Sequence, residues 1–312
     1  MQPFSVKINM PNNSKNPSTA VLLAAYNGID FIQQQIESIL SQRSADIHIY
    51  ISIDKSSDGT EDLVTSLSQS TPNIHILKTN HHFGSAASNF FHLLINVNFS
   101  SFDYISLSDQ DDIWDTDKII NAIKLVKKGN YDAYSGNVTA FWPNDRYKLI
   151  KKSQKQRHSD YMFESAGPGC TFVLTRPLAL DLQDFLLKNH NRIQKVDLHD
   201  WFIYAFARSR GYIWHIDHES HMLYRQHNGN VFGANAGIKA KIIRWKKLRS
   251  GWLTNQAIII AEILNYDHYY PIKQLKTYSL LDRSFLILNI NKFRRRFRDR
   301  IALLLLFLLP TP

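Results

Sequence analysis

The chain alternates between short apolar runs and longer segments in which apolar residues recur at helical spacing. The segments "TAVLLAAYN", "IHIYISID", "NIHILKT" and "FDYISLSD" are short and rich in apolar or β-branched residues, which is typical of buried strands. Between them, "DFIQQQIESILSQ", "SSDGTEDLVTSLSQ" and "SAASNFFHLLINV" have the spacing or the start residues of helices. Strands that alternate with helices predict an α/β fold in which a mainly parallel sheet is flanked by helices on both faces.

Polar residues follow three of the predicted strands at the point where each strand ends. Asn27-Gly28 follows the first strand, Asp54 with Ser56 to Thr60 follows the second, and Asp109 to Asp112 follows the last. Because ligands of such sheets bind beyond the carboxyl ends of the strands, we expect these segments to meet in one cleft.

The regular pattern loosens beyond Trp142 but returns in two segments. "GCTFVLTRPLAL" predicts a strand and a helix start, and "VDLHDWFIYAFARSRGYIWHI" predicts a helix that runs into a strand. We therefore predict one domain over residues 18–237, with a first half of about 18–115 and a second half of about 116–237. Residues 1–17 scatter Pro and Asn and are expected to form a loose leader, and residues 238–312 to form a helical extension.

The extension ends in a basic segment followed by an apolar one, "NKFRRRFRDR" and "IALLLLFLL". The apolar run is too short to span a bilayer, which needs roughly 20 apolar residues. Two interpretations remain open. The extension either lies on an acidic membrane surface, or packs as a helix on the domain or on a partner chain. In the first case the interfacial aromatic residues would be Trp245, Trp252, Tyr269 and Tyr270.

Charge and cysteine content limit the classes of partner and site. The formal net charge of +10 in 312 residues favours an anionic partner, such as nucleic acid, acidic lipid or a phosphorylated substrate. The clearest basic cluster sits in the tail and not across the fold among aromatic residues, so we expect no nucleic acid partner. The single cysteine, Cys170, excludes an internal disulfide and a zinc site built on several thiolates. This favours a cytoplasmic setting, extending to the inner face of the cell membrane.

The segment "SLSDQDDIWDTDK" gathers acidic residues in a basic chain. Asp109 and Asp111, one residue apart at a strand end, can direct their oxygens to a common point. Such oxygen ligands favour Mg²⁺ or Mn²⁺ with a diphosphate-bearing substrate, and we expect this cation, and not Lys or Arg, to offset the carboxylates. The alternative is structural, because Asp109 also suits a turn and Asp112 or Asp115 suits a helix cap.

Four segments in order, "AAYNGIDFIQQQIESILSQ", "SIDKSSDGTEDL", "NHHFGSAASNF" and "YISLSDQDDIWDTDKI", together resemble glycosyltransferase family 2, whose members have the GT-A nucleotide-sugar fold. The resemblance covers about residues 19–234. Within the family, "SDQDDIW" is similar to the bacterial rhamnosyltransferase-type members that build surface polysaccharides such as O-antigen.

The resemblance implies that the first half binds the donor nucleotide. Its contacts would be Ala25, Tyr26, Asp54, Asn89 and Asp109. An aromatic ring offers a stacking face, and a carboxylate such as that of Asp54 accepts a hydrogen bond from a pyrimidine N–H. The metal ligands would be Asp111 and, from "YRQHNGNVFGA", His227. The other histidines His81, His82, His215, His218 and His221 are interpreted as surface or core residues.

The second half would bind the acceptor. Asp200 in "LHDWFIYAFA" resembles the catalytic base of the family, which takes the proton of the acceptor hydroxyl as that oxygen attacks and inverts the anomeric carbon. An N-cap of the following helix is the structural alternative for Asp200. Further residues are expected to contact the diphosphate or the acceptor, namely Asp112, Gly169, His199, Trp201 and Arg225.

Two departures from the family pattern concern the donor. Ile53 precedes Asp54 where many members have a second acid, and Ser88 precedes Asn89 where Arg is frequent. The resemblance nevertheless implies an inverting, metal-dependent transferase that moves a sugar to a saccharide or lipid-linked saccharide hydroxyl, with dTDP-rhamnose or a UDP-sugar favoured as the donor. The alternatives are a sugar-phosphate nucleotidyltransferase and a non-catalytic basic protein that binds membrane or nucleic acid.

Overall fold

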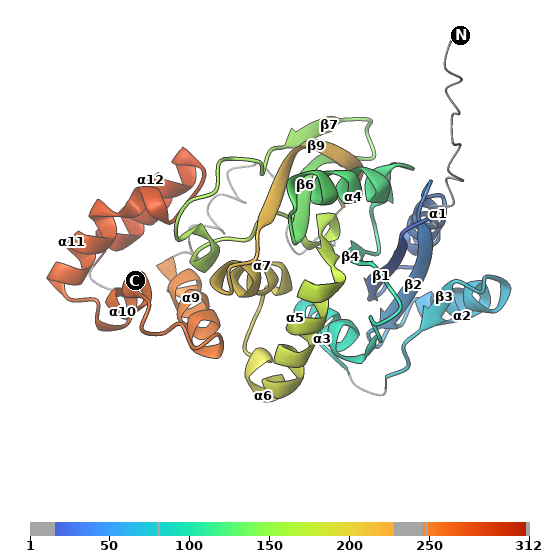
Figure 1. Ribbon diagram of the computed structural model, residues 1–312, viewed down its shortest axis with the longest axis horizontal. Helices are drawn as coiled ribbons and strands as arrows, with labels where there is room; N and C mark the ends of the chain where they lie inside the picture. Colours follow the sequence, from blue (N-terminus) through green and yellow to red (C-terminus); the bar gives the residue numbers. More distant parts are fainter. Residues whose placement is uncertain (1–15, 80–81, 228–245, 247–248, 310–312) are drawn as a thin grey trace, which may run out of the picture.

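A single mixed sheet organises the protein (Figure 1). The computed structural model describes residues 16–79, 82–227, 246 and 249–309. Its strands are β1 (Ser18–Ala25), β2 (Asp46–Ile53), β3 (Ile74–Ile76), β4 (Tyr104–Asp109), β5 (Ile113–Trp114), β6 (Ala133–Phe141), β7 (Tyr147–Ile150), β8 (Val173–Thr175) and β9 (Trp214–Arg225). They follow the order β3-β2-β1-β4-β8-β6-β9-β5, and β7 pairs with β6.

The parallel part of the sheet is the one that the sequence pattern predicts. β1 pairs in parallel with β2 and β4, and β2 pairs in parallel with β3. β8 then runs antiparallel to both β4 and β6, and β5 and β7 are also antiparallel to their neighbours. A fourth parallel pair, β6 with β9, lies beyond β8. The α/β class with a flanked sheet is therefore confirmed, and each antiparallel pair includes a strand that comes after Asp109.

Helices cover the two faces of the sheet with separate apolar cores. On one face lie α1 (Ile32–Leu40), α2 (Thr60–Ser70) and α4 (Lys118–Gly129). On the other lie α3 (Ala86–Asn96), α5 (Arg176–Lys188) and α7 (His199–Ser209), with the short α6 (His190–Ile193) between the last two in sequence. In α1 the buried Ile32, Ile36 and Ile39 recur every three or four residues, which places one apolar face against the sheet.

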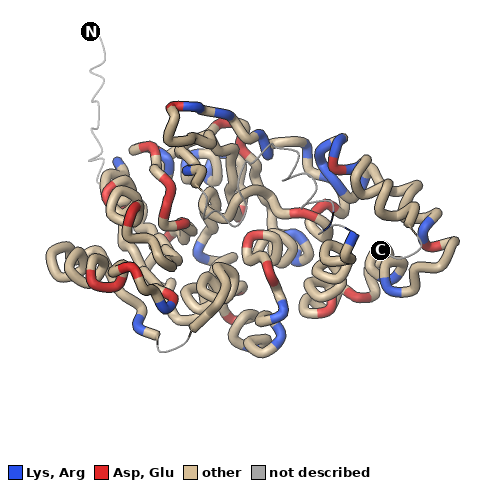
Figure 2. The backbone as a smooth tube through the Cα atoms, turned by 180° about the vertical axis from the view of Figure 1, so that it is seen from behind, with Lys and Arg blue, Asp and Glu red and all other residues tan. Residues whose placement is uncertain are grey.

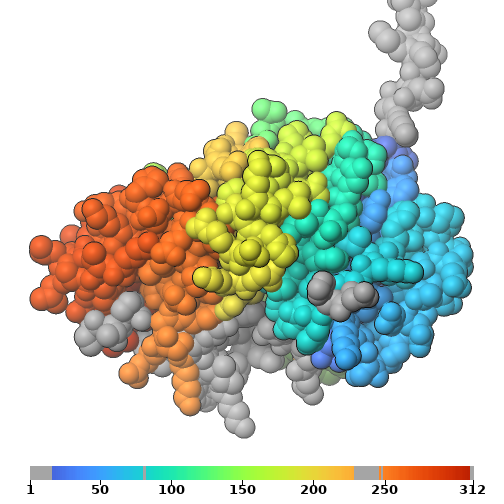
Figure 3. Space-filling view, turned by 90° about the horizontal axis from the view of Figure 1, so that it is seen from below, coloured from blue at the N-terminus to red at the C-terminus, as the bar shows by residue number. Residues whose placement is uncertain are grey.

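The C-terminal helices form one end of the molecule, opposite β1 to β3 (Figures 1 and 3). They are α9 (Trp252–Ile263), α10 (Tyr270–Thr277), α11 (Leu280–Leu288) and α12 (Phe297–Phe307). Leu253, Ala257 and Phe307 are buried in the same apolar cluster as α3, α5 and α7. One side of the extension therefore packs on the domain, as the second of the two interpretations predicts. Trp245 lies outside the described residues, and within the described part no helix has both the length and the apolar composition needed to cross a membrane.

Candidate active site

The three turns predicted to meet do lie at one edge of the sheet. The register pairs Ala25 with Ile53 and Ala24 with Asp109, so β1, β2 and β4 end side by side. Main-chain N–H groups of the first turn bond to side chains of the second. Gly28 donates to the Thr60 hydroxyl over 2.8 Å. These bonds hold the two turns as one rigid rim.

Gln110 is the middle residue of the D-x-D segment, and its side chain makes two hydrogen bonds to the main chain of Tyr26. The Tyr26 N–H donates to Gln110 Oε1 over 2.8 Å, and Gln110 Nε2 donates back to the Tyr26 carbonyl over 2.8 Å. A Cβ at Gly28 would lie 2.3 Å from Gln110 Oε1, so a larger residue there would displace the Gln110 amide from Tyr26. The Tyr26 ring remains 52% exposed and offers a stacking face. Sequence reasoning missed Gln110, although its place between the two acids was the available signal.

Asp54 and Asn89 are buried behind this rim. The Asp54 carboxylate accepts main-chain N–H groups of Lys55, Phe83 and Gly84 and lies 2.8 Å from the His82 ring. Asn89 donates from Nδ2 to the carbonyls of Ala25 and Ser52. Asn89 therefore braces the ends of β1 and β2, a role that the sequence analysis did not anticipate.

A buried cluster lies behind the D-x-D segment. Ligand atoms of Asp109, Asp112 and Cys170 all lie within 4.8 Å of one another. Burial and the neighbouring Asp111 charge raise the pKa values of Asp109 and Asp112. The Lys118 ammonium is also buried, 3.4 Å from the centre of the Trp114 ring, and burial lowers its pKa to about 7. Lys118 Nζ and Asp112 Oδ2 are both buried without a hydrogen-bond partner in the described part of the structure, so the expectation that a divalent cation offsets these carboxylates stays a prediction.

The two predicted metal ligands meet although 116 positions separate them. Asp111 Oδ2 lies 2.7 Å from His227 Nε2. Arg225 supports this pair, since its Nε donates to the Asp111 carbonyl over 2.8 Å and its Nη2 to Gln34 Oε1 over 2.6 Å. A carboxylate oxygen beside an imidazole nitrogen suits Mg²⁺ or Mn²⁺. The residues present therefore fit a divalent cation at this point.

Asp200 stands at the start of α7, on the second half of the site. Its Oδ1 accepts the Trp201 N–H over 2.7 Å. Burial raises the pKa of Asp200 to about 6, against the opposing effects of that N–H, the Lys152 charge and the Ser165 hydroxyl. A carboxyl group with this pKa is ionised at neutral pH and more basic than an ordinary aspartate, which suits a general base.

The neighbours of Asp200 have structural roles. His199 stacks on Phe90 with ring centres 4.0 Å apart, and burial lowers its pKa to about 3, so it is neutral. A Cβ at Gly169 would lie 2.5 Å from His199 Nε2, so this glycine leaves room for the side chain at the start of α7. Trp201 is buried and donates from Nε1 to the Tyr161 carbonyl. Asp112 is fully buried. Gly169, Trp201 and Asp112 are thus buried in this structure, and their contacts with the diphosphate or the acceptor stay predictions.

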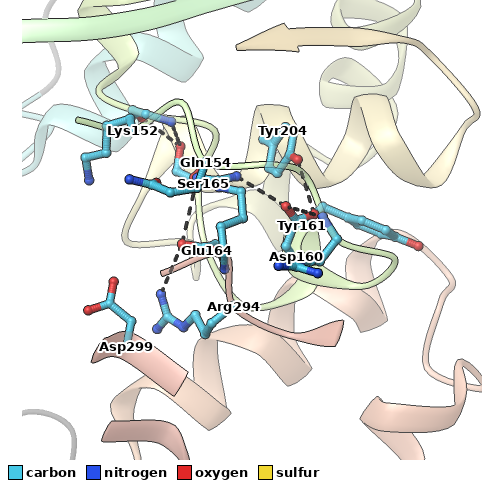
Figure 4. A network of polar contacts seen from close by, with 12 residues as sticks. Lys152, Gln154, Asp160, Tyr161, Glu164, Ser165, Tyr204, Arg294 and Asp299 are labelled. Carbon is cyan, nitrogen blue, oxygen red and sulfur yellow. Dashed lines mark hydrogen bonds and ion pairs between the residues drawn. The ribbon is translucent and has the colours of Figure 1, made fainter. Parts of the chain in front are cut away.

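The C-terminal extension also reaches the second half of the site (Figure 4). Arg295 is buried, and its Nη1 lies 3.4 Å from Asp160 Oδ2. Its Nη2 donates a hydrogen bond to the Ser165 carbonyl. Its main-chain N–H donates to Glu164 Oε1 over 2.6 Å. The Ser165 hydroxyl in turn favours the charged form of Asp200 by a hydrogen bond. The arginine segment, residues 294–296, therefore helps to place a residue that contacts the base.

Comparisons with known proteins agree with this arrangement. A family model described as Glycosyl transferase family 2 matches residues 20–178. The dTDP-rhamnosyl transferase RfbG of Shigella flexneri is 41% identical over 288 residues, which cover 92% of this chain and 99% of RfbG. The chain belongs to glycosyltransferase family 2. Its motifs are those of a bacterial rhamnosyltransferase-like member, so the recognition from the four segments is confirmed, as is the glycosyltransferase class over the two alternatives.

Two further comparisons of this family 2 glycosyltransferase are with a second bacterial enzyme and with a solved structure. The UDP-Glc:alpha-D-GlcNAc-diphosphoundecaprenol beta-1,3-glucosyltransferase WfaP of Escherichia coli is 35% identical over 108 residues, 35% of this chain and 41% of WfaP. The structure of the mannosyltransferase PcManGT from Pyrobaculum calidifontis, in complex with GDP-Man and Mn²⁺, has a TM-score of 0.54 at 15% identity, covering 95% of this chain and 85% of that one. This likeness confirms the GT-A fold.

Proposed function

We propose that the protein is an inverting, metal-dependent glycosyltransferase that moves rhamnose from dTDP-rhamnose to a hydroxyl of a saccharide or lipid-linked saccharide in bacterial surface-polysaccharide synthesis. The observation that carries the proposal is the 2.7 Å approach of Asp111 and His227 at the sheet edge where Tyr26 and Asp109 lie. The similarity to a dTDP-rhamnosyl transferase over 92% of the chain supports this donor, and a UDP-sugar is the second choice.

Each group has a distinct task in this reaction. The exposed Tyr26 ring stacks on the nucleotide base, and Gln110 fixes its main chain. Asp111 and His227 would hold a divalent cation, which neutralises the charge of the leaving diphosphate. Asp200 takes the proton of the acceptor hydroxyl. Attack from the side opposite the leaving diphosphate inverts the anomeric carbon.

The first test is metal-dependent nucleotide binding. We expect dTDP with Mn²⁺ to raise the melting temperature, because a ligand at 100 times its Kd stabilises the folded state by about 2.7 kcal/mol. Asp111→Ala should lose the Mn²⁺-dependent part of this shift. The measurement is a thermal-shift series of dTDP, UDP and GDP with and without Mn²⁺. Equal shifts with and without the metal in the wild-type protein would contradict the metal role.

The acceptor is proposed to reach the site at a membrane surface. WfaP acts, by its name, on a diphosphoundecaprenol-linked sugar, which supports a lipid-linked acceptor. Several apolar side chains of the C-terminal helices point outward, namely Leu280 (76% exposed), Leu281 (83%), Leu288 (82%) and Phe297 (73%). Figure 2 shows basic residues along the segment that leads into α12. Outward apolar residues beside cations suit an acidic bilayer at the inner face of the cell membrane.

Membrane contact predicts selective flotation with vesicles. The protein should float with vesicles that contain phosphatidylglycerol and not with pure phosphatidylcholine, and the double variant Leu281→Glu, Leu288→Glu should reduce flotation severalfold. Leu187→Glu is the matched control, since Leu187 is an exposed leucine of α5 outside the extension. Equal flotation of the double variant and the control would refute this surface.

A further inference from the structure

Asp54 and His82 form a hydrogen-bonded pair at the carboxyl end of β2. His82 Nδ1 lies 2.8 Å from Asp54 Oδ1. The two side chains differ in access, because the His82 side chain is 60% exposed and that of Asp54 only 6%. The imidazole thus stands in front of the carboxylate.

The Asp54 carboxylate is already occupied by donors of its own chain. Besides His82, it accepts N–H groups of Lys55 over 2.8 Å, Phe83 over 2.9 Å and Gly84 over 2.9 Å. Burial works to raise the pKa of Asp54, but the N–H donors of Phe83, His82 and Gly84 outweigh it and hold the pKa below its usual value. Asp54 therefore stays ionised and offers little room for a donor from a ligand.

An ionised carboxylate only accepts hydrogen bonds, so this contact selects the tautomer of His82 that carries its proton on Nδ1. The other ring nitrogen, Nε2, then carries a lone pair and is an acceptor. Asp54 sets this state in the way that a carboxylate orients an imidazole in many binding sites.

The pair lies beside the proposed nucleotide contacts. The Asp54 N–H donates to the Ala25 carbonyl over 2.8 Å, next to the exposed ring of Tyr26. The preceding residue, Ile53, is apolar, so the end of β2 has no second carboxylate beside Asp54. The exposed His82 ring offers a hydrogen-bond acceptor at this end of the site.

We propose that His82 reads the pyrimidine base of the donor, with Nε2 accepting the N3–H of thymine or uracil and Asp54 acting as its positioning residue. This inference rests on the proposed nucleotide-sugar donor and deepens it. A contact of this kind would favour thymine and uracil over cytosine, because N3 of cytosine carries no hydrogen and is itself an acceptor. Two acceptors face each other in that case, and dCDP binds poorly.

The test compares dTDP and dCDP by calorimetry in the presence of Mn²⁺. The wild-type protein should bind dTDP at least about tenfold more tightly, which is the size of one neutral hydrogen bond. His82→Phe keeps a ring but removes the acceptor, and should weaken dTDP about tenfold without weakening dCDP. His82→Gln restores an acceptor and should recover part of the preference. His218→Phe, at an exposed histidine of β9, is the control.

Kinetics separate a base-reading role from a merely structural one. His82→Phe should raise KM for dTDP-rhamnose with kcat little changed, because the base contact is the same in the ground and transition states. A His82→Phe protein that keeps the wild-type dTDP preference overturns this inference alone. A wild-type protein that binds neither diphosphate overturns the proposed function and the inference with it.

Discussion

Asp200→Asn is expected to lower kcat by about 10² to 10⁴, the usual contribution of a positioned general base. The amide has nearly the shape of the carboxylate and can still accept the Trp201 N–H, which spans 2.7 Å in the wild-type protein. It cannot take a proton from the acceptor. The measurement is transfer of labelled rhamnose from dTDP-rhamnose to a lipid-linked saccharide, with dTDP binding checked by calorimetry and expected to be unchanged.

The pH dependence of kcat supplies a second readout of the same group. Burial raises the pKa of Asp200 to about 6, and only the deprotonated form is a base. The wild-type rate should therefore fall about tenfold per pH unit below that value and level off above it. Asp184→Asn, at an exposed acid of α5, should leave both rate and profile unchanged. An Asp200→Asn protein with wild-type kcat would remove Asp200 from the mechanism.

The donor edge was predictable because it depends on local patterns and one topological rule. Apolar runs identify β1, β2 and β4, and the polar residues after them must meet where parallel strands end. Asn27 shows how local this information is. It adopts a positive φ of 44° in the first turn, and its Oδ1 accepts the Ser57 N–H of the second turn. Turn residues of this type carry their own signal.

The inner side of the D-x-D segment was not predictable from local pattern. Asp112 meets Cys170 because β8 lies antiparallel to β4, and no pattern near either residue announces that pairing. Lys118 reads as a surface residue at a helix start, yet it is buried against Trp114. The burial of Trp201 beside Asp200 is likewise not local, since its indole N–H finds the Tyr161 carbonyl 40 positions earlier.

The C-terminal extension shows the same limit over a longer separation. Its run of arginines predicts an anionic partner but not which one. Arg295 pairs with Asp160 and Glu164, which lie more than a hundred positions earlier and read as loop acids. Arg298, three residues on, is exposed. Within one basic cluster, Arg295 therefore forms buried ion pairs, whereas Arg298 faces the solvent.

Arg295→Met is expected to destabilise the protein by about 3 to 5 kcal/mol, the usual result of removing one partner of a buried ion pair. Asp160 is fully buried and would keep the more distant Arg208, 3.6 Å away, and two neutral donors, the Tyr204 hydroxyl and the Arg157 N–H. Arg298→Met is the matched control, since its exposed side chain should change the free energy of unfolding by no more than about 0.5 kcal/mol. The measurement is chemical unfolding followed by fluorescence.

The shape of the unfolding transition adds to this result. Leu253 and Phe307 share an apolar cluster with Phe202 of α7, so the extension and the sheet should unfold together. Arg295→Met should therefore shift one cooperative transition to lower denaturant and not split it into two. Two separate transitions in the variant, with the first confined to the extension, would mean that the arginine segment is an independent appendage. In that case its contacts to Ser165 and Glu164 would not help to hold the base Asp200 in place.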